Sequence, residues 1–90
     1  SFDNDGSDIY TIIEVDTRDR PGLLYDLTQV MSQSNIYISH AVIATYGAQV
    51  VDVFYVKDLF GLKLWSKPKQ DALAAKLREA VSRAAARAGA

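Results

Sequence analysis

The residues best suited to bind a ligand form the run Asp19-Arg20-Pro21-Gly22-Leu23-Leu24. The run would open a helix, and the unpaired N–H groups at a helix start can bind an anion. Asp19 beside them could bind an ammonium group, and Gly22 has no Cβ to keep a ligand away. A carboxylate and an ammonium group together describe a free amino acid. The simpler alternative is helix capping by Asp19 with close helix packing at Gly22, and these residues alone favour that alternative.

The other residues give little sign of catalysis. The chain has no cysteine and one histidine, His40, which argues against a disulfide framework, a thiol nucleophile and a cysteine zinc site. His40 is therefore predicted to be a structural or interface residue. We expect no catalytic residue, no metal site and no cofactor in this chain, and the lack of cysteine fits a reducing cytoplasmic setting.

The charge balance argues against two classes of partner. Ten Lys and Arg residues against eleven Asp and Glu residues give a net charge of -1. Binding to nucleic acid or to anionic membranes would require a basic excess. The hydrophobic share of 49% is that of a folded chain, and no apolar run approaches the roughly 18 residues of a membrane span. The sequence predicts one soluble domain that binds neither nucleic acid nor membrane.

Hydrophobic periodicity predicts the element order β-α-β-β-α. The strands and helices are expected, in chain order, at residues 9–16, 21–34, 36–45, 50–57 and 66–87. Asp19 would cap the first helix and Pro21 would lie in its first turn. The alternation falters near Ser39, His40 and Ala41, which indicates a bulge in the second strand.

Two segments fall outside this pattern. Residues 1–8 are polar and acidic, and they are interpreted as a linker or an extraneous remnant, so that the domain covers residues 9–88. Residues 62–65 would form a short extra strand or a loop that packs on the sheet. No strand is predicted after the second helix, so the sheet is expected to be one strand short of a complete split β-α-β sandwich.

The third predicted strand is apolar on both sides, which suggests that both faces of the sheet are covered. Aromatic residues on an open sheet face could stack RNA bases, but such sheets need basic surroundings that this chain lacks. A protein interface, in a homodimer or between domains, accounts better for these residues. The predicted interface residues are Tyr10, Ile12, Val51, Val53 and Tyr55.

With Asn35-Ile36 opening the second strand, residues 9–87 resemble the ACT family of small regulatory domains, whose hallmark is a D/N-R-P-G-L-L-type turn at a helix start. The resemblance implies an α+β, ferredoxin-like two-layer sandwich that lacks the family's usual fourth strand, which puts the usual side-by-side pairing of ACT sheets in doubt. It also implies a free amino acid bound between this turn and a neighbouring ACT domain. The residues carried over to that site are Asp19, Arg20, Pro21, Gly22, Leu23, Leu24, Asn35 and Ile36.

The run A-T-Y-G-A-Q-V-V-D-V-F-Y-V-K-D-L-F-G-L-K is similar, more narrowly, to ACT domains of bifunctional enzymes that modify PII signalling proteins. That resemblance implies a non-catalytic domain that senses glutamine in nitrogen regulation. It also implies PII as the substrate of the whole enzyme, Mg²⁺ in the catalytic domains, and an adjacent ACT domain as partner. Two alternatives stay open: an ACT domain with a different ligand, and a dimerisation module that binds none.

Overall fold

Alternating burial along the strands shows how the sequence builds the sheet. In β4 (Gln49–Lys57), Phe54 and Val56 are buried and Tyr55 between them is half-buried. β2 (Thr11–Arg18) begins with the same alternation, because Thr11 and Ile13 are buried. A period of two in a strand places every second side chain on the same face. One face of the sheet therefore supplies the core.

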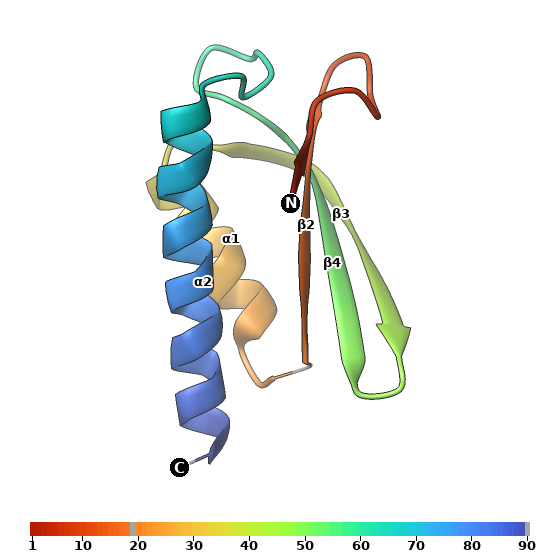
Figure 1. Cartoon of the computed structure of the whole chain (residues 1–90), viewed down its shortest axis with the longest axis vertical. Coiled ribbons are helices and arrows are strands. Elements are labelled where there is room, and N and C mark those ends of the chain that lie inside the picture. The colour runs from red at the N-terminus through yellow and green to blue at the C-terminus, as the bar shows by residue number, and fades with distance from the viewer. Residues whose placement is uncertain (19, 90) are drawn as a thin grey trace.

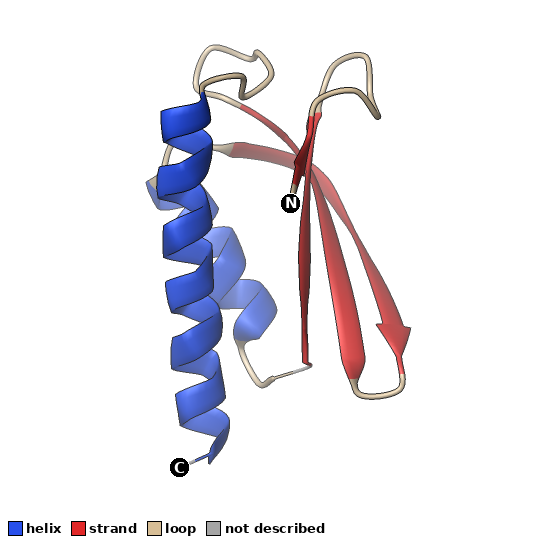
Figure 2. Ribbon diagram, viewed as in Figure 1, coloured by secondary structure: helices blue, strands red, loops and turns tan. Residues whose placement is uncertain are grey.

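The structure is a computed structural model and describes residues 1–18 and 20–89. The sheet has four antiparallel strands in the order β1-β2-β4-β3, and both helices cover the same face of it (Figure 1, Figure 2). This confirms the predicted α+β ferredoxin-like two-layer sandwich. The elements other than β2 and β4 are β1 (Phe2–Asp3), α1 (Leu23–Gln33), β3 (Tyr37–Tyr46) and α2 (Lys67–Gly89).

The core lies between the sheet and the two helices. Phe54 of β4 and Leu27 and Met31 of α1 are fully buried in it. α2 adds a stripe of apolar residues at a helical spacing of three or four, which turns one side of the helix toward the core. The buried residues of that stripe are Leu73, Leu77, Ala80 and Ala84.

The fourth strand of the sheet comes from the N-terminal segment. Phe2 pairs with Ile13 and Asp3 pairs with Ile12, and the backbone N–H of Glu14 donates to the carbonyl oxygen of Ser1 at 2.9 Å. Phe2 also packs against the core. The interpretation of residues 1–8 as a linker is therefore wrong for Phe2–Asp3, and so is the expectation of a sheet that is one strand short. As predicted, no strand follows α2 among the described residues. Two residues are too few to show a period of two, so the sequence pattern could not reveal β1.

Residues 62–65 form a loop and not an extra strand. Leu64 is buried in the core, and its backbone N–H donates to the buried hydroxyl of Thr11 at 2.8 Å. That hydroxyl donates in turn to the side-chain oxygen of Asn4. The loop is thus attached to both β2 and the N-terminal segment, as the alternative of a loop packed on the sheet predicts.

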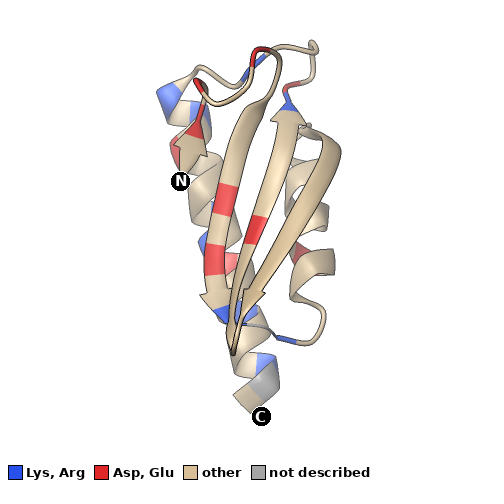
Figure 3. Ribbon diagram, turned by 90° about the vertical axis from the view of Figure 1, so that its right-hand side faces the viewer, with Lys and Arg blue, Asp and Glu red and all other residues tan. Residues whose placement is uncertain are grey.

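The remaining details of the sheet follow the sequence closely. A shift in register between Ile38 and His40 confirms the predicted bulge, and the hairpin between β3 and β4 turns at Gly47, which has φ +65°. The prediction that both faces are covered is not met within this chain. Figure 3 looks onto the sheet with the helices behind it, and within residues 1–18 and 20–89 no helix or strand covers that open face.

Candidate functional site: the turn that opens α1

The turn between β2 and α1 is built around Gly22. Gly22 is the N-cap residue of α1 and has φ +76°, in the left-handed region that glycine adopts without strain. α1 therefore begins at Leu23, and Pro21, predicted for the first helical turn, lies before the helix. Asp19, the predicted cap and ammonium ligand, lies outside the described residues.

The first turn of α1 presents its backbone N–H groups to one side of the turn. The N–H of Leu23 donates to the carbonyl oxygen of Arg20 at 3.2 Å, and the N–H of Asp26 donates to that of Gly22 at 3.0 Å. The N–H groups of Leu24 and Tyr25 lie between them, in the part of a helix where no intrahelical acceptor exists. The Leu23 side chain is buried in the core, so Leu23 can meet a ligand only through its backbone.

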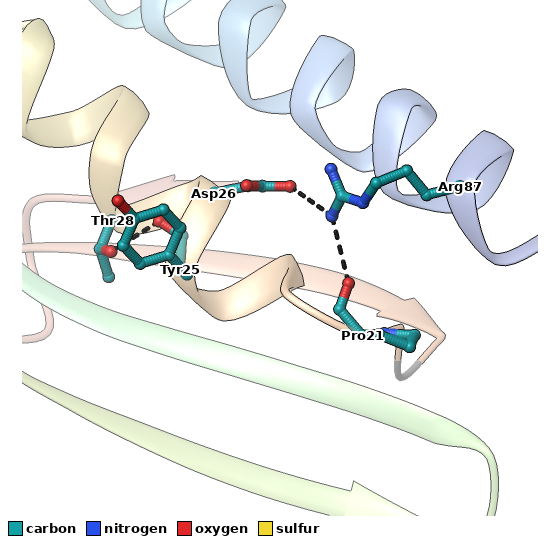
Figure 4. A network of polar contacts seen from close by, with 5 residues as sticks. All are labelled: Pro21, Tyr25, Asp26, Thr28 and Arg87. Carbon is teal, nitrogen blue, oxygen red and sulfur yellow. Dashed lines mark hydrogen bonds and ion pairs between the residues drawn. The ribbon is translucent and has the colours of Figure 1, made fainter.

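Arg87, in the last turn of α2, contacts this turn (Figure 4). Its Nη2 atom donates to the carbonyl oxygen of Pro21 at 3.1 Å and to Oδ2 of Asp26 at 2.7 Å. The same nitrogen lies 3.2 Å from the position that a Cβ on Gly22 would occupy. The sequence did not indicate this contact, because nothing in a helical pattern signals a partner on another element.

Asn35 and Ile36 lie at the other end of α1, where they terminate the helix. Asn35 has φ +61°, its N–H donates to the carbonyl oxygen of Ser32 at 3.1 Å, and the N–H of Ile36 donates to that of Met31 at 2.9 Å. These two bonds make a Schellman motif, with Ile36 and Met31 both buried in the core as that motif favours. This structural role explains both residues without a ligand.

The two predicted halves of the site are therefore not brought together within one chain. α1 has 11 residues between them, and at 1.5 Å per residue it is about 16 Å long. A single amino acid is too short to contact Leu24 and Asn35 of the same chain. A ligand that touches both segments must lie between two copies of such a domain.

Comparison with known families agrees with this fold. The model of a family described as an ACR9-like, ACT-like domain matches residues 1–86, a range that includes β1. The chain belongs to the ACT-like domain family.

The curated relatives of this ACT domain are far longer proteins. The chain is 70% identical over 88 residues to the bifunctional uridylyltransferase/uridylyl-removing enzyme of Cereibacter sphaeroides, and 67% identical over 90 residues to that of Ruegeria pomeroyi. These matches cover 98% and 100% of the chain but 10% of each relative. The enzyme of the same name from Azospirillum brasilense is 54% identical over 68 residues, 76% of the chain and 7% of the relative. The chain spans about a tenth of these relatives, and no solved structure matches it significantly.

The five predicted interface residues of the ACT domain share the open face of the sheet. Ile12 lies opposite Tyr55 in the pairing of β2 with β4, and Val51 and Val53 lie on the same side of β4 as Tyr55. Tyr10, just before β2, meets Tyr55 edge-on with ring centroids 6.3 Å apart. All five are half-buried, although no helix or strand among the described residues covers them. The structure thus forms the predicted patch, while its role as an interface stays a prediction.

His40 joins this patch from β3. Its ring stacks on Tyr55 with centroids 4.3 Å apart and an interplanar angle of 13°, and it meets Tyr10 edge-on at 5.8 Å. Lys57 places its ammonium group 5.2 Å from the centroid of the Tyr10 ring, a cation–π distance. The hydroxyl of Ser39 donates to that of Tyr10 at 2.9 Å. The bulge in β3 therefore helps to build an ordered aromatic cluster, which the sequence alone did not indicate.

A cavity of about 370 Å³ lies near the C-terminal end of α1, and it shares no residue with the turn. Asn35 and Ile36 line it together with Leu64 and Leu73, and Lys69 and Lys76 contribute two basic side chains.

Among the described residues, no group of three or more acidic or histidine side chains could hold a metal ion. Within the same residues, no helix has the length and apolar character needed to cross a membrane.

Proposed function

We propose that this ACT domain is the C-terminal, non-catalytic, glutamine-sensing domain of a cytoplasmic bifunctional uridylyltransferase/uridylyl-removing enzyme in nitrogen regulation. The observation that carries the proposal is 70% identity over 98% of the chain to an enzyme of that name. In this proposal the transferase and hydrolase sites, the Mg²⁺ ions and the PII protein substrate belong to other domains of the enzyme.

The proposed glutamine site pairs the turn of this domain with an adjacent ACT domain. The N–H groups of Leu24 and Tyr25 would bind the ligand's carboxylate, because the start of a helix carries a partial positive charge. Asp19 would bind the ammonium group, and Arg20, Pro21 and the backbone of Leu23 would complete this half. The adjacent domain would contribute the segment that corresponds to Asn35 and Ile36. The separation of the two segments by the length of α1 supports a site shared between domains.

The free edge of β3 supports such a neighbour. β3 is an edge strand of the sheet. Val42 and Ile43, on its two faces, are each about half exposed, at 51% and 50%. An uncovered apolar edge strand is a ready template for pairing with another strand. β1 and the preceding Ser1, in contrast, cover the edge of β2 at Ile12, Ile13 and Glu14. We therefore expect the adjacent ACT domain, or a second copy in a homodimer of this chain, to pair along β3.

Regulation would follow from a difference in affinity. Glutamine shifts the balance between uridylyl transfer and removal only if it binds one arrangement of the two ACT domains more tightly than the other. The domain itself needs no catalytic residue for this. Ligand binding would change the position of the adjacent ACT domain, and that change would alter the activity of the catalytic domains.

A melting screen of the whole enzyme against the twenty amino acids tests the ligand. We expect glutamine at one hundred times its dissociation constant to stabilise the folded enzyme by about 2.7 kcal/mol and to raise its melting temperature more than the other nineteen. A larger shift with another amino acid would favour the alternative of an ACT domain with a different ligand. No shift with any amino acid would contradict the proposal.

A ligand-free assembly module is the second candidate, favoured by the uncovered patch of Tyr10, Ile12, Val51, Val53 and Tyr55. Such a module needs the patch but not the turn. If this domain is a ligand-free assembly module, substitutions at Tyr55 should change the oligomeric state, while substitutions at Gly22 should leave the regulation of the enzyme unchanged.

A further inference from the structure

Arg87 joins the end of α2 to the turn that holds the proposed ligand site. Nη2 donates to the Pro21 carbonyl oxygen and to the Asp26 carboxylate, at 3.1 and 2.7 Å (Figure 4). The Asp26 side chain is 21% exposed and that of Arg87 is 51% exposed. The contact is thus a charge-assisted hydrogen bond, and solvent screens it only in part.

The two acceptors lie on either side of Gly22. Pro21 precedes Gly22, and Asp26 follows it in the first helical turn of α1. One nitrogen of Arg87 therefore binds the chain on both sides of Gly22, which we call the two arms of the turn. The arms fix the direction of the N–H groups of Leu23, Leu24 and Tyr25. Without this contact the turn loses its one ion pair among the described residues, and the N–H groups of Leu24 and Tyr25, which have no acceptor within the helix, are held less firmly.

We propose that Arg87 is a positioning residue for the amino-acid site, which holds the turn in the conformation that binds the ligand; this inference rests on the proposed function. A turn that is already ordered loses less freedom on binding, so the ligand binds more tightly. The coupling is reciprocal: a ligand that prefers the ordered turn also strengthens the contact of Arg87 with it. Ligand binding is thereby linked to the end of α2, 66 residues along the chain from Pro21.

Arg87→Met in the whole enzyme tests the inference, with Arg83→Met as the matched control. Arg83 lies one turn earlier on α2 and pairs with Glu79, at 3.8 Å, instead of with the turn. We expect Arg87→Met to weaken glutamine binding about two- to fivefold, as suits a half-exposed ion pair, and Arg83→Met to leave it unchanged. Arg87→Lys, which keeps the charge, should recover part of the loss. An unchanged dissociation constant in Arg87→Met would overturn the inference.

Hydrogen exchange separates this inference from the proposed function. Without ligand, the amides of residues 23–26 should exchange faster in Arg87→Met than in Arg83→Met, and saturating glutamine should slow exchange at residues 84–89 of the parent enzyme. If the parent binds no amino acid, the proposed function fails, and the exchange of residues 23–26 then decides alone: faster exchange in Arg87→Met supports the positioning of the turn. Equal exchange in the two variants would overturn it.

Discussion

Gly22 has two separate reasons to be glycine. Its φ of +76° is one, and the Nη2 atom of Arg87, 3.2 Å from where a Cβ would lie, is the other. The sequence identified the residue but not these reasons, because it predicted a helical Pro21 and space reserved for a ligand. A positive φ at a helix start depends on how the chain leaves β2, and the Arg87 contact depends on how α2 packs. Neither is encoded in the local spacing.

Alanine at Gly22 should separate the two reasons. A left-handed conformation costs a non-glycine residue about 1–2 kcal/mol, and Gly22→Ala adds the conflict with Arg87. Gly47→Ala is the matched control, because Gly47 has φ +65° and no atom within 4 Å of its Cβ position. In urea unfolding of the 90-residue chain we expect Gly22→Ala to lose more unfolding free energy than Gly47→Ala. In the Arg87→Met background the two losses should become equal, and an excess that persists there would contradict this explanation.

At the scale of elements, the strands and helices that are long and periodic could be predicted and the short one could not. The helix predicted for residues 66–87 is α2 at Lys67–Gly89, and the strand predicted for 50–57 is β4 at Gln49–Lys57. β1 escaped prediction because its single apolar residue, Phe2, stands in a polar segment. Its pairing with β2 is a long-range contact, and burial of Phe2 exists only once Ile13 is in place. The failure to predict β1 was therefore an error about tertiary contacts, not about local propensity.

Phe2→Ala tests whether β1 is part of the folded unit. Removing a partly buried phenylalanine from the edge of the core should cost about 1–3 kcal/mol of unfolding free energy, below the range for a fully buried ring. Phe60→Ala is the control of the same type, because Phe60 is 77% exposed, and it should change the unfolding free energy by less than about 0.5 kcal/mol. Equal losses in chemical denaturation would show that β1 does not stabilise the domain.

For the whole molecule, the unsatisfied features all point outward from one domain. The turn and the Asn35–Ile36 segment lie at opposite ends of α1. Among the described residues, no strand pairs with the free edge of β3, and no helix or strand covers the sheet face opposite the helices. The sequence indicated the open-face patch from alternation alone. It could not indicate that the two parts of the site are separated, because spacing along a chain does not give the distance across a helix.

Tyr55→Lys should show whether the open face holds domains together. A lysine there would place a charge beside His40, which stacks on Tyr55, and would require burial of that charge in any interface on this face. If the homodimer forms through the open face, sedimentation velocity should show a dimer for the parent chain and a monomer for Tyr55→Lys. If it forms along β3, Tyr55→Lys should remain a dimer. Gln29→Lys, on the exposed side of α1, should sediment like the parent. A dimer in all three proteins would place the interface elsewhere, and a monomeric parent chain would contradict the expected homodimer.

The most direct test of the central claim is the glutamine dependence of PII uridylylation by the whole enzyme. Gly22→Val is compared with Gly47→Val, since both place a β-branched residue at positive φ but only Gly22 lies in the turn between β2 and α1. Gly22→Ala serves as a milder substitution if Gly22→Val does not fold. We predict that the turn variants raise the glutamine concentration of half-maximal effect by at least about tenfold, equivalent to 1.4 kcal/mol, while Gly47→Val leaves it unchanged. An unaltered glutamine response in folded Gly22 variants would contradict a glutamine site at this turn.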